Sequence, residues 1–263
     1  MTARSQAKKS GTKQQTAVYI YGMLPADTDI ESGTAGVGDP PGEVRLVRHR
    51  DLAAMVSDVD VDRPLGRPED LTVHQELLDS AAGDLPVLPL RFGSVVTDDE
   101  AVTTELLEPH YDEFASALDE LDGRAEYVVN GRYDENAIIQ EVLAEDDEAA
   151  ALRKQVMGKS EDETRDARIQ LGEILNNATS AKRERDTQSL GDAVAGHVVS
   201  SVVRQPTHEL DAVYTAFLVE SSEAPELERA LQQLASDWEG RVELRLMGPL
   251  AAYDFVGTVS PGD

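Results

Sequence analysis

The sequence feature that most constrains the fold is a long polar stretch with helical patterning, enclosed between two strand-like segments. Residues 124–133 (RAEYVVNGRY) and 213–219 (VYTAFLV) are rich in the β-branched and aromatic residues that favour strands. From residue 135 to about 204, apolar residues recur at helical spacing among charged ones. We therefore expect two antiparallel helices in this stretch. The breaks are expected at Gly158, Gly172, Gly191 and the pair Asn176-Asn177.

The C-terminal part of the chain continues this alternation of strand and helix. Residues 225–238 have an amphipathic helical pattern, and residues 242–247 and 251–256 have strand patterns. Strand, helical insertion, strand, helix and strand follow one another in the order of a ferredoxin-like unit. The sequence thus predicts an α+β fold with a modified ferredoxin-like C-terminal domain at 123–256, its helical insertion at about 135–204, and a tail at 257–263.

The N-terminal part predicts a second α+β domain, at residues 16–122, ending at the turn Asp122-Gly123. Strands are expected at 17–21 (AVYIY), 44–46 and 53–59, with a loop at 25–42. A helix is expected from Pro68 to Gly83 with Leu71, Leu77, Leu78 and Ala81 on its buried face. Two further segments complete this domain: an edge strand within 85–92 (LPVLPLRF) and a helix capped by residues 97–100 that runs to Leu121. Residues 1–15 are expected to be a disordered basic arm.

The charge of the chain narrows the classes of partner. It has 51 acidic and 24 basic residues, giving a formal net charge of -27, which disfavours nucleic acid and anionic membranes as partners. Only six residues are Lys, and carboxylates run along nearly every polar stretch, a balance typical of haloarchaeal proteins. Because molar salt shortens the Debye length to about 3 Å, we expect the fold to need high salt.

Several classes of site lack their usual sequence signals. The chain has no Cys, its five His stand apart without metal-ligand spacing, and no Ser lies in a GxSxG setting. Glycines 33, 36 and 38 form GxxGxG, which is not a phosphate-binding order. We therefore predict no catalytic residue, no cofactor and no metal. No apolar run approaches a membrane span and the start is not a signal peptide, so a cytoplasmic location is expected.

Two segments are more informative than the rest. Arg91 interrupts the apolar run PLRFG, so it either pairs with a buried carboxylate or backbone carbonyls, which we favour, or contacts a partner. Near the end, residues 247–256 (MGPLAAYDFV) predict a turn that carries Tyr253 and Phe255 into the core. His74 is expected to be structural, with Glu76 or Asp79 as a possible partner.

Four segments together resemble the GvpF/GvpL gas vesicle family: VYIYG at 18–22, VLPLRFG at 87–93, the strand at 214–219, and GP followed by YDFV at 248–256. The length, acidity and charged middle are most similar to a haloarchaeal member of the L type. Where many members have Trp-Pro-Pro, this chain has Leu250-Ala251-Ala252. The residues that carry the family signature are Tyr19, Tyr21, Gly22, Pro89, Arg91, Phe92, Gly93, Gly248, Pro249, Tyr253 and Phe255.

The resemblance implies a non-enzymatic accessory protein of two α+β domains. It implies a role in vesicle assembly, association with gas vesicles, and contacts with the shell protein GvpA and other accessory proteins. The alternative is a ferredoxin-like ligand sensor or enzyme, which would need a pocket lined by His74, His110 or Arg91. The insertion at about 135–204 is a candidate partner surface, with self-packing as an equally weighted alternative.

Overall fold

The computed structural model describes residues 16–63 and 65–256, and they divide into two compact units. The first contains residues 16–122 together with Val256, and the second contains residues 123–255. The expected basic arm at 1–15 and tail at 257–263 lie outside the described residues.

The first unit is built on an antiparallel sheet with the path β4-β5-β1-β6, while β7 also pairs with β1. Its strands are β1 (Thr16–Pro25), β4 (Arg45–His49), β5 (Leu52–Asp60), β6 (Leu88–Pro89) and β7 (Val95–Val96). The three strands expected near the N-terminus are confirmed, and β6 ends the path as an edge strand. The expected loop at 25–42 is wrong in part, because β2 (Ala35–Gly38) and β3 (Pro41–Glu43) form a hairpin within it.

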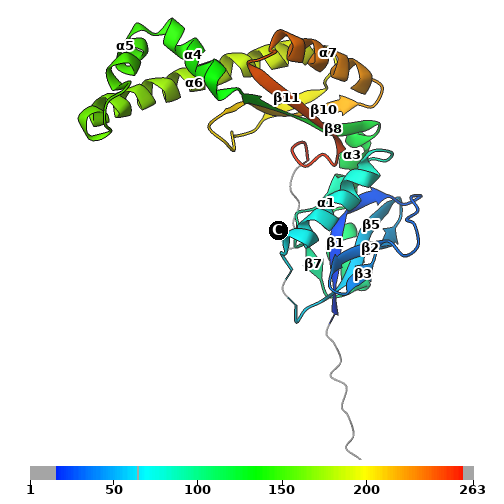
Figure 1. Ribbon diagram of the computed structural model, residues 1–263. Coiled ribbons are helices and arrows are strands. Elements are labelled where there is room, and N and C mark those ends of the chain that lie inside the picture. The colour runs from blue at the N-terminus through cyan, green and yellow to red at the C-terminus, as the bar shows by residue number, and fades with distance from the viewer. Residues whose placement is uncertain (1–15, 64, 257–263) are drawn as a thin grey trace, which may run out of the picture. The chain divides into compact units, whose positions relative to one another are not determined.

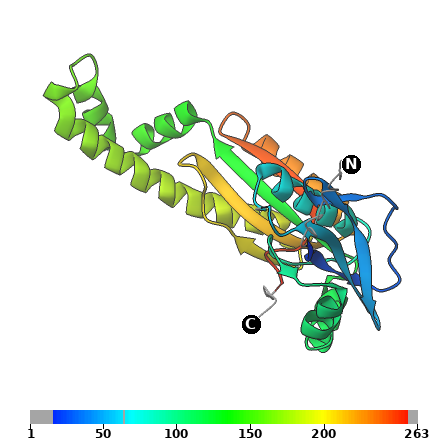
Figure 2. The same ribbon diagram turned by 90° about the horizontal axis from the view of Figure 1, so that it is seen from below.

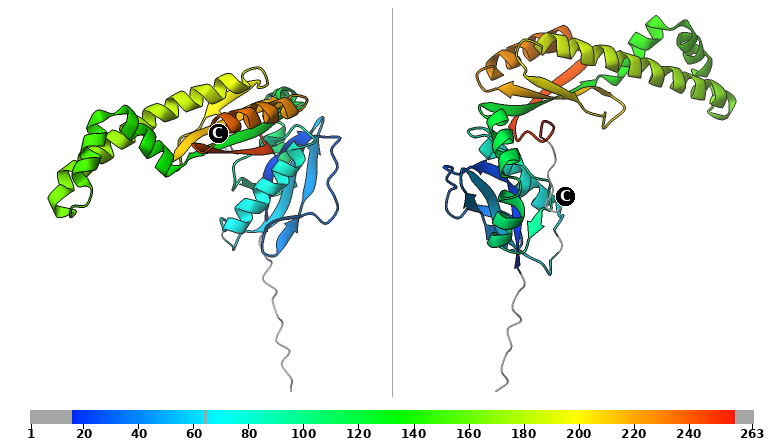
Figure 3. Two further views of the ribbon diagram at one scale, coloured as in Figure 1. Left: turned by 45° about the horizontal axis from the view of Figure 1, so that its top comes forward. Right: turned by 180° about the vertical axis from the view of Figure 1, so that it is seen from behind.

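Helices cover both faces of this sheet (Figures 1 and 3). Val18 and Ile20 of β1 point into one core, which Phe114 and Leu118 of α3 (Tyr111–Leu121) close. The side chain of Tyr19, between Val18 and Ile20, points the opposite way, toward α1 (Pro68–Ala82), because successive residues of a strand alternate between its faces. Ahead of α3, Asp98 caps the short helix α2 (Asp99–Ala101) as expected. The π-helix η1 (Val102–Leu107) then interrupts the single helix that the sequence predicts.

The buried face of α1 differs from the predicted one. Leu71 is 44% exposed, whereas the buried positions follow a spacing of four residues. These positions are Asp70, His74, Leu78 and Ala82. The face of a helix that becomes buried depends on what packs against it. The opposing sheet offers hydroxyl groups as well as apolar surface, so α1 also buries polar side chains, and a search for apolar spacing does not detect them.

The second unit contains a four-stranded antiparallel sheet in the order β11-β8-β10-β9. Its strands are β8 (Arg124–Tyr133), β9 (Ser200–Val203), β10 (Asp211–Glu220) and β11 (Val242–Leu250). Three α-helices and the short 3-10 helix η2 (Asp162–Thr164) connect β8 to β9, so the expectation of two helices there is wrong, and α7 (Ala224–Asp237) connects β10 to β11. The expected strand at 251–256 is wrong: Ala251 and Ala252 are buried, and the chain turns at residues 253–255.

The helical insertion consists of α4 (Glu135–Glu145), α5 (Asp147–Val156) and α6 (Arg165–Val194), which extend beyond the sheet (Figures 1 and 2). It ends at Val194 rather than about 204, because β9 follows. Gly158 breaks the chain as predicted, with φ of 75°, but Gly172 and Gly191 lie inside α6. One half of α6 packs on α5 and the other on the sheet, and this packing outweighs the low helix propensity of glycine.

The apolar stripe of the insertion is occupied within the chain. Leu152 and Val156 of α5 pack against Leu171 of α6, with Ile174 and Leu175 alongside. This favours the self-packing interpretation of that stripe. None of the helices in the described part of the chain combines the length and the apolar character that a membrane span requires.

Candidate functional site

The N-terminal signature residues gather around His74, on the face of the first sheet that α1 covers. The ring centroids of Tyr19 and Tyr21 are 4.8 Å apart, and the other ring contacts among Tyr19, Tyr21, Phe92 and His74 have centroid distances of 5.6 to 5.9 Å. The Tyr19 hydroxyl lies 2.8 Å from His74 Nδ1 and accepts a hydrogen bond from the Gly93 amide. We call Tyr19, Tyr21, His74 and Phe92 the aromatic cluster. It joins β1, α1 and the turn after β6.

Tyr21 and Gly22 secure neighbouring segments of the same unit. The buried Tyr21 hydroxyl lies 2.8 Å from Ser57 Oγ and accepts a hydrogen bond of 2.7 Å from the Val37 amide, which fixes the β2–β3 hairpin. A Cβ on Gly22 would lie 2.6 Å from the Leu88 carbonyl oxygen, so β6 can approach β1 only at glycine.

The PLRFG segment forms the end of β6 and the turn that follows it. Pro89 is buried in β6, and Gly93 has φ of 93°, a conformation that glycine adopts without strain. Arg91 lies at the surface, and its carbonyl oxygen accepts hydrogen bonds from the Ser94 amide and hydroxyl. Arg91 is exposed because β6 ends at Pro89 and the turn carries the next polar side chain outward, and the pairing expected for its guanidinium stays a prediction.

Burial controls the charge of His74. The residue is 1% exposed, and desolvation lowers its pKa from 6.5 to about 4, with a hydrogen bond to the Leu90 backbone partly offsetting the shift. Its ring contacts Tyr19. It is thus a neutral packing residue of the core.

We expect His74 to make stability depend on pH. The unfolded chain binds a proton at this ring near pH 6.5, while the folded chain does so only near pH 4, so stability is lost as pH falls through that window. In urea unfolding at pH 7, 6 and 5, the wild-type free energy of unfolding should fall more steeply than that of His74→Gln. Carboxylates titrate in both proteins, so equal slopes would contradict the expectation.

The C-terminal signature residues lie in the second unit, around the end of β11. Gly248 has φ of 151°, and a Cβ there would lie 2.4 Å from Tyr127 Cδ1. The Gly248-Pro249 peptide bond is cis. Tyr253 and Phe255 are only half-buried, whereas Ala251 and Ala252 are fully buried. The expected delivery of both aromatic rings to the core is therefore wrong, since the small alanines occupy it.

Arg204 ties the C-terminal segment to two strands of this sheet. Its guanidinium donates to Glu126 Oε1 and to Asp254 Oδ2, both at 2.6 Å, and to the Tyr214 hydroxyl at 3.1 Å. The Glu126 side chain is only 2% exposed, and its other oxygen accepts from the Asp254 amide. Burial disfavours the charge of Arg204, but its bonds to Asp254 and Tyr214 raise its pKa above the usual value.

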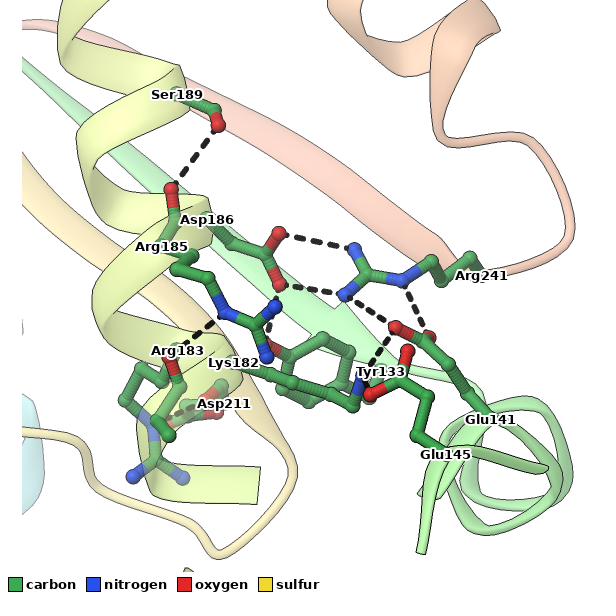
Figure 4. Close-up of polar contacts among 11 residues, drawn as sticks. Tyr133, Glu141, Glu145, Lys182, Arg183, Arg185, Asp186, Ser189, Asp211 and Arg241 are labelled. Atoms are coloured by element: carbon green, nitrogen blue, oxygen red, sulfur yellow. Dashed lines mark hydrogen bonds and ion pairs between the residues drawn. The ribbon is translucent and has the colours of Figure 1, made fainter. Parts of the chain in front are cut away.

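A second charged group lies where the helical insertion joins the sheet (Figure 4). Lys182 of α6, 2% exposed, donates to Glu141 and Glu145 of α4 at 2.6 Å each. Arg241 contacts Glu141 and also Asp186, at 2.8 Å each. Burial acts to raise the pKa of Glu141, but hydrogen bonds from Arg241 and Lys182 outweigh it and lower that pKa.

The junction also includes Tyr133 of β8. Its hydroxyl donates to Asp186 at 2.5 Å, and burial together with this bond raises the pKa of Tyr133. The group holds α4, α6, β8 and the residue before β11 in one arrangement. In a medium of reduced dielectric constant such paired charges fix geometry more than they add stability.

Sequence reasoning missed both charged groups. Only weak signals mark them: Glu126 interrupts the apolar run AEYVV, and Lys182 is a lysine in a chain that has six. The charged partners of Lys182, and the Arg204 and Asp254 groups that contact Glu126, lie 37 to 128 residues away in the sequence, so no local pattern shows these contacts. Within residues 16–63 and 65–256 there is no group of three or more His, Asp or Glu side chains arranged to hold a metal ion.

Taken together, these features define an α+β protein of two compact units, in which signature glycines and aromatics shape the core and buried ion pairs join its elements. The model of the family "Gas vesicle synthesis protein GvpL/GvpF" matches residues 17–257. The chain therefore belongs to the GvpL/GvpF gas vesicle family.

Relatives of both types match over most of their lengths. Gas vesicle protein F of Streptomyces sp. (strain CB03234) is 32% identical, with 91% of this chain and 99% of the relative covered. Gas vesicle protein L1 of Halobacterium salinarum is 27% identical, with 90% and 89% covered. The crystal structure of GvpF from Anabaena sp. PCC7120 superposes with a TM-score of 0.75 at 23% identity, covering 93% of this chain and 99% of that one.

Proposed function

We propose that the protein is an accessory factor in gas vesicle assembly and acts through contacts with the shell protein GvpA and other accessory proteins. The observation that carries the proposal is the family match across residues 17–257. The charged groups described above are paired with one another inside the fold, which supports a non-enzymatic role. We place the protein in the cytoplasm, associated with gas vesicles.

The acidic surface gives this role a physical basis. The formal net charge of -27 places many strongly hydrated carboxylates on the chain, and in this proposal that surface keeps a complex with an apolar shell protein in solution. In this proposal the protein keeps the shell protein from aggregating and delivers it to the growing vesicle.

We also infer that the two units are separate domains and that the second is a modified ferredoxin-like fold. The strand order β11-β8-β10-β9 supports this, because β10 lies between β8 and β9 and is antiparallel to both. Along the chain, helices follow β8 and β10, as in a split β-α-β unit. The 30-residue α6 and its partners are the modification.

The alternative, a ligand sensor or an enzyme, needs His74, His110 or Arg91 to line a pocket. His74 is 1% exposed within the aromatic cluster, so no ligand reaches it. His110 is beside Glu113 at the start of α3, and Arg91 lies on an exposed turn. The placement of these residues does not favour this alternative.

Affinity capture tests the proposed function. The tagged full-length chain is co-expressed with the gas vesicle proteins, recovered at molar salt, and its retained partners are quantified by mass spectrometry against an unrelated acidic halophilic protein. We expect enrichment of GvpA or another vesicle accessory protein. Capture no greater than that of the control protein would overturn the proposal.

A further inference from the structure

The strand β9 is an exposed edge of the second-unit sheet. It pairs only with β10 in the described sheet, and all four of its residues are exposed. Val202 is 36% exposed and Val203 is 61% exposed, while Val199, just before the strand, is 45% exposed. Val202 and Val203 point to opposite faces of the sheet, so both sides of this edge are apolar.

The charge pattern around β9 is unusual for this chain. There is no Asp or Glu from Ala193 to His208, although the chain has 51 acidic residues among 263. Proteins commonly protect an edge strand with charged side chains, bulges or proline, because its unpaired backbone groups can join another sheet. This edge has no such charge within the strand.

The backbone direction shows which groups of β9 are available. The Arg204 amide donates to the Tyr214 carbonyl oxygen of β10, so the side of the chain facing β10 is fixed at that residue. Hydrogen-bonded and non-hydrogen-bonded positions alternate along an antiparallel pair. The amides and carbonyls of Ser201 and Val203 therefore point away from β10, toward the open edge.

A groove runs beside this edge, between β9–β10 and the helix α6. Its volume is about 400 Å³, and its lining includes Arg183, Glu184, Thr187, Val203, Pro206 and Val213. Glu184 is exposed. An added strand beside β9 would place alternate side chains in this groove and leave the others on the opposite face of the sheet.

We propose that β9 binds an extended segment of another gas vesicle protein, which adds to the sheet as a fifth strand along the groove beside α6. Backbone hydrogen bonds with Ser201 and Val203 supply affinity, and the groove selects side chains. The segment is apolar, because the edge valines are exposed. It is neutral or basic, because Arg183 and Glu184 balance one another in the groove and the net charge of -27 disfavours an acidic segment. The same charge disfavours a second copy of this chain. The inference rests on the proposed function for the source of the partner.

Two edge variants test this inference in the capture experiment with co-expressed vesicle proteins. Ser201→Pro removes an outward amide without changing charge, and Val203→Lys places a cation on the edge. We expect each to reduce recovery of one vesicle protein about tenfold. Ser201→Pro does so by removing a backbone hydrogen bond, and Val203→Lys by replacing the apolar contact with a charge that must be desolvated. Ser201→Ala and Ile169→Lys, the latter at an exposed position of α6, should retain wild-type recovery.

Circular dichroism at molar salt shows whether the edge variants keep the fold, and a photo-crosslinking residue at Val203 of the otherwise wild-type chain gives a second readout. The cross-link is expected in an extended segment of a vesicle protein. Undiminished recovery by both folded edge variants, or cross-links only to another copy of this chain, would overturn the inference while leaving the proposed function intact. A wild-type chain that recovers no vesicle protein would overturn both.

Discussion

Replacing Arg204 with methionine is expected to lower the free energy of unfolding of the second unit by about 3–5 kcal/mol. The substitution removes the Arg204 guanidinium from the Glu126 carboxylate, whose side chain is 2% exposed. It also releases Asp254, which Arg204 holds at 2.6 Å. Removing one member of a buried pair is costly because the remaining charge stays desolvated. Urea unfolding in molar salt measures the loss.

Two further variants distinguish the cost of leaving a buried charge unpaired from a nonspecific loss of stability on replacing an arginine. Arg245→Met removes an arginine that is 71% exposed and paired with Glu243, so we expect a change within about 0.5 kcal/mol. Arg204→Met combined with Glu126→Leu removes both buried charges and should recover at least half of the lost stability. A loss below 1 kcal/mol for Arg204→Met alone would contradict this account.

Transfer from molar salt to about 50 mM salt is expected to unfold the protein, because the Debye length grows several-fold and self-repulsion is no longer screened. The formal net charge is -27, and carboxylates such as Asp58 and Asp99 remain more than half exposed even where they pair with Arg45. Far-ultraviolet circular dichroism during salt titration measures the transition. An unchanged spectrum at low salt would contradict the prediction.

A control distinguishes charge screening from a general stabilising effect of solutes. Trimethylamine N-oxide favours folded states by exclusion from the protein surface and does not screen charge. If it restored the fold at low salt at the same osmotic strength as sodium chloride does, charge screening would not be needed to explain the effect of the salt. We expect sodium chloride to act at far lower osmotic strength.

The sequence predicted most regular elements correctly, because their signals are local. The alternating β-branched and aromatic residues of β1, β8 and β10 indicate strands, and Pro68 with two following acids marks the start of α1. Residues 97–100 were predicted to cap a helix, and among them Asp98 accepts a hydrogen bond from the Ala101 amide at 2.9 Å. These features depend on residues only a few positions apart.

The errors occurred where long-range packing decides the outcome. The β2–β3 hairpin looked like a loop because it is rich in glycine, yet a Cβ on Gly36 would lie 2.4 Å from the Tyr21 hydroxyl. Gly36 is therefore required by a close approach to β1, and Gly42 by a close approach to the Asp58 backbone of β5, which no local pattern reveals. Gly172 was predicted to break a helix, but nothing lies within 4 Å of its Cβ position and α6 continues through it.

The sequence by itself determined the family, the α+β order of elements and the acidic surface, since each depends on residue types and their order along the chain. Only the tertiary structure decided that His74 is a neutral core residue, that Lys182 and Arg204 join distant elements, and that β9 is an open edge. The physical reason is that burial and pairing depend on neighbours brought together by folding, and sequence separation carries no record of them.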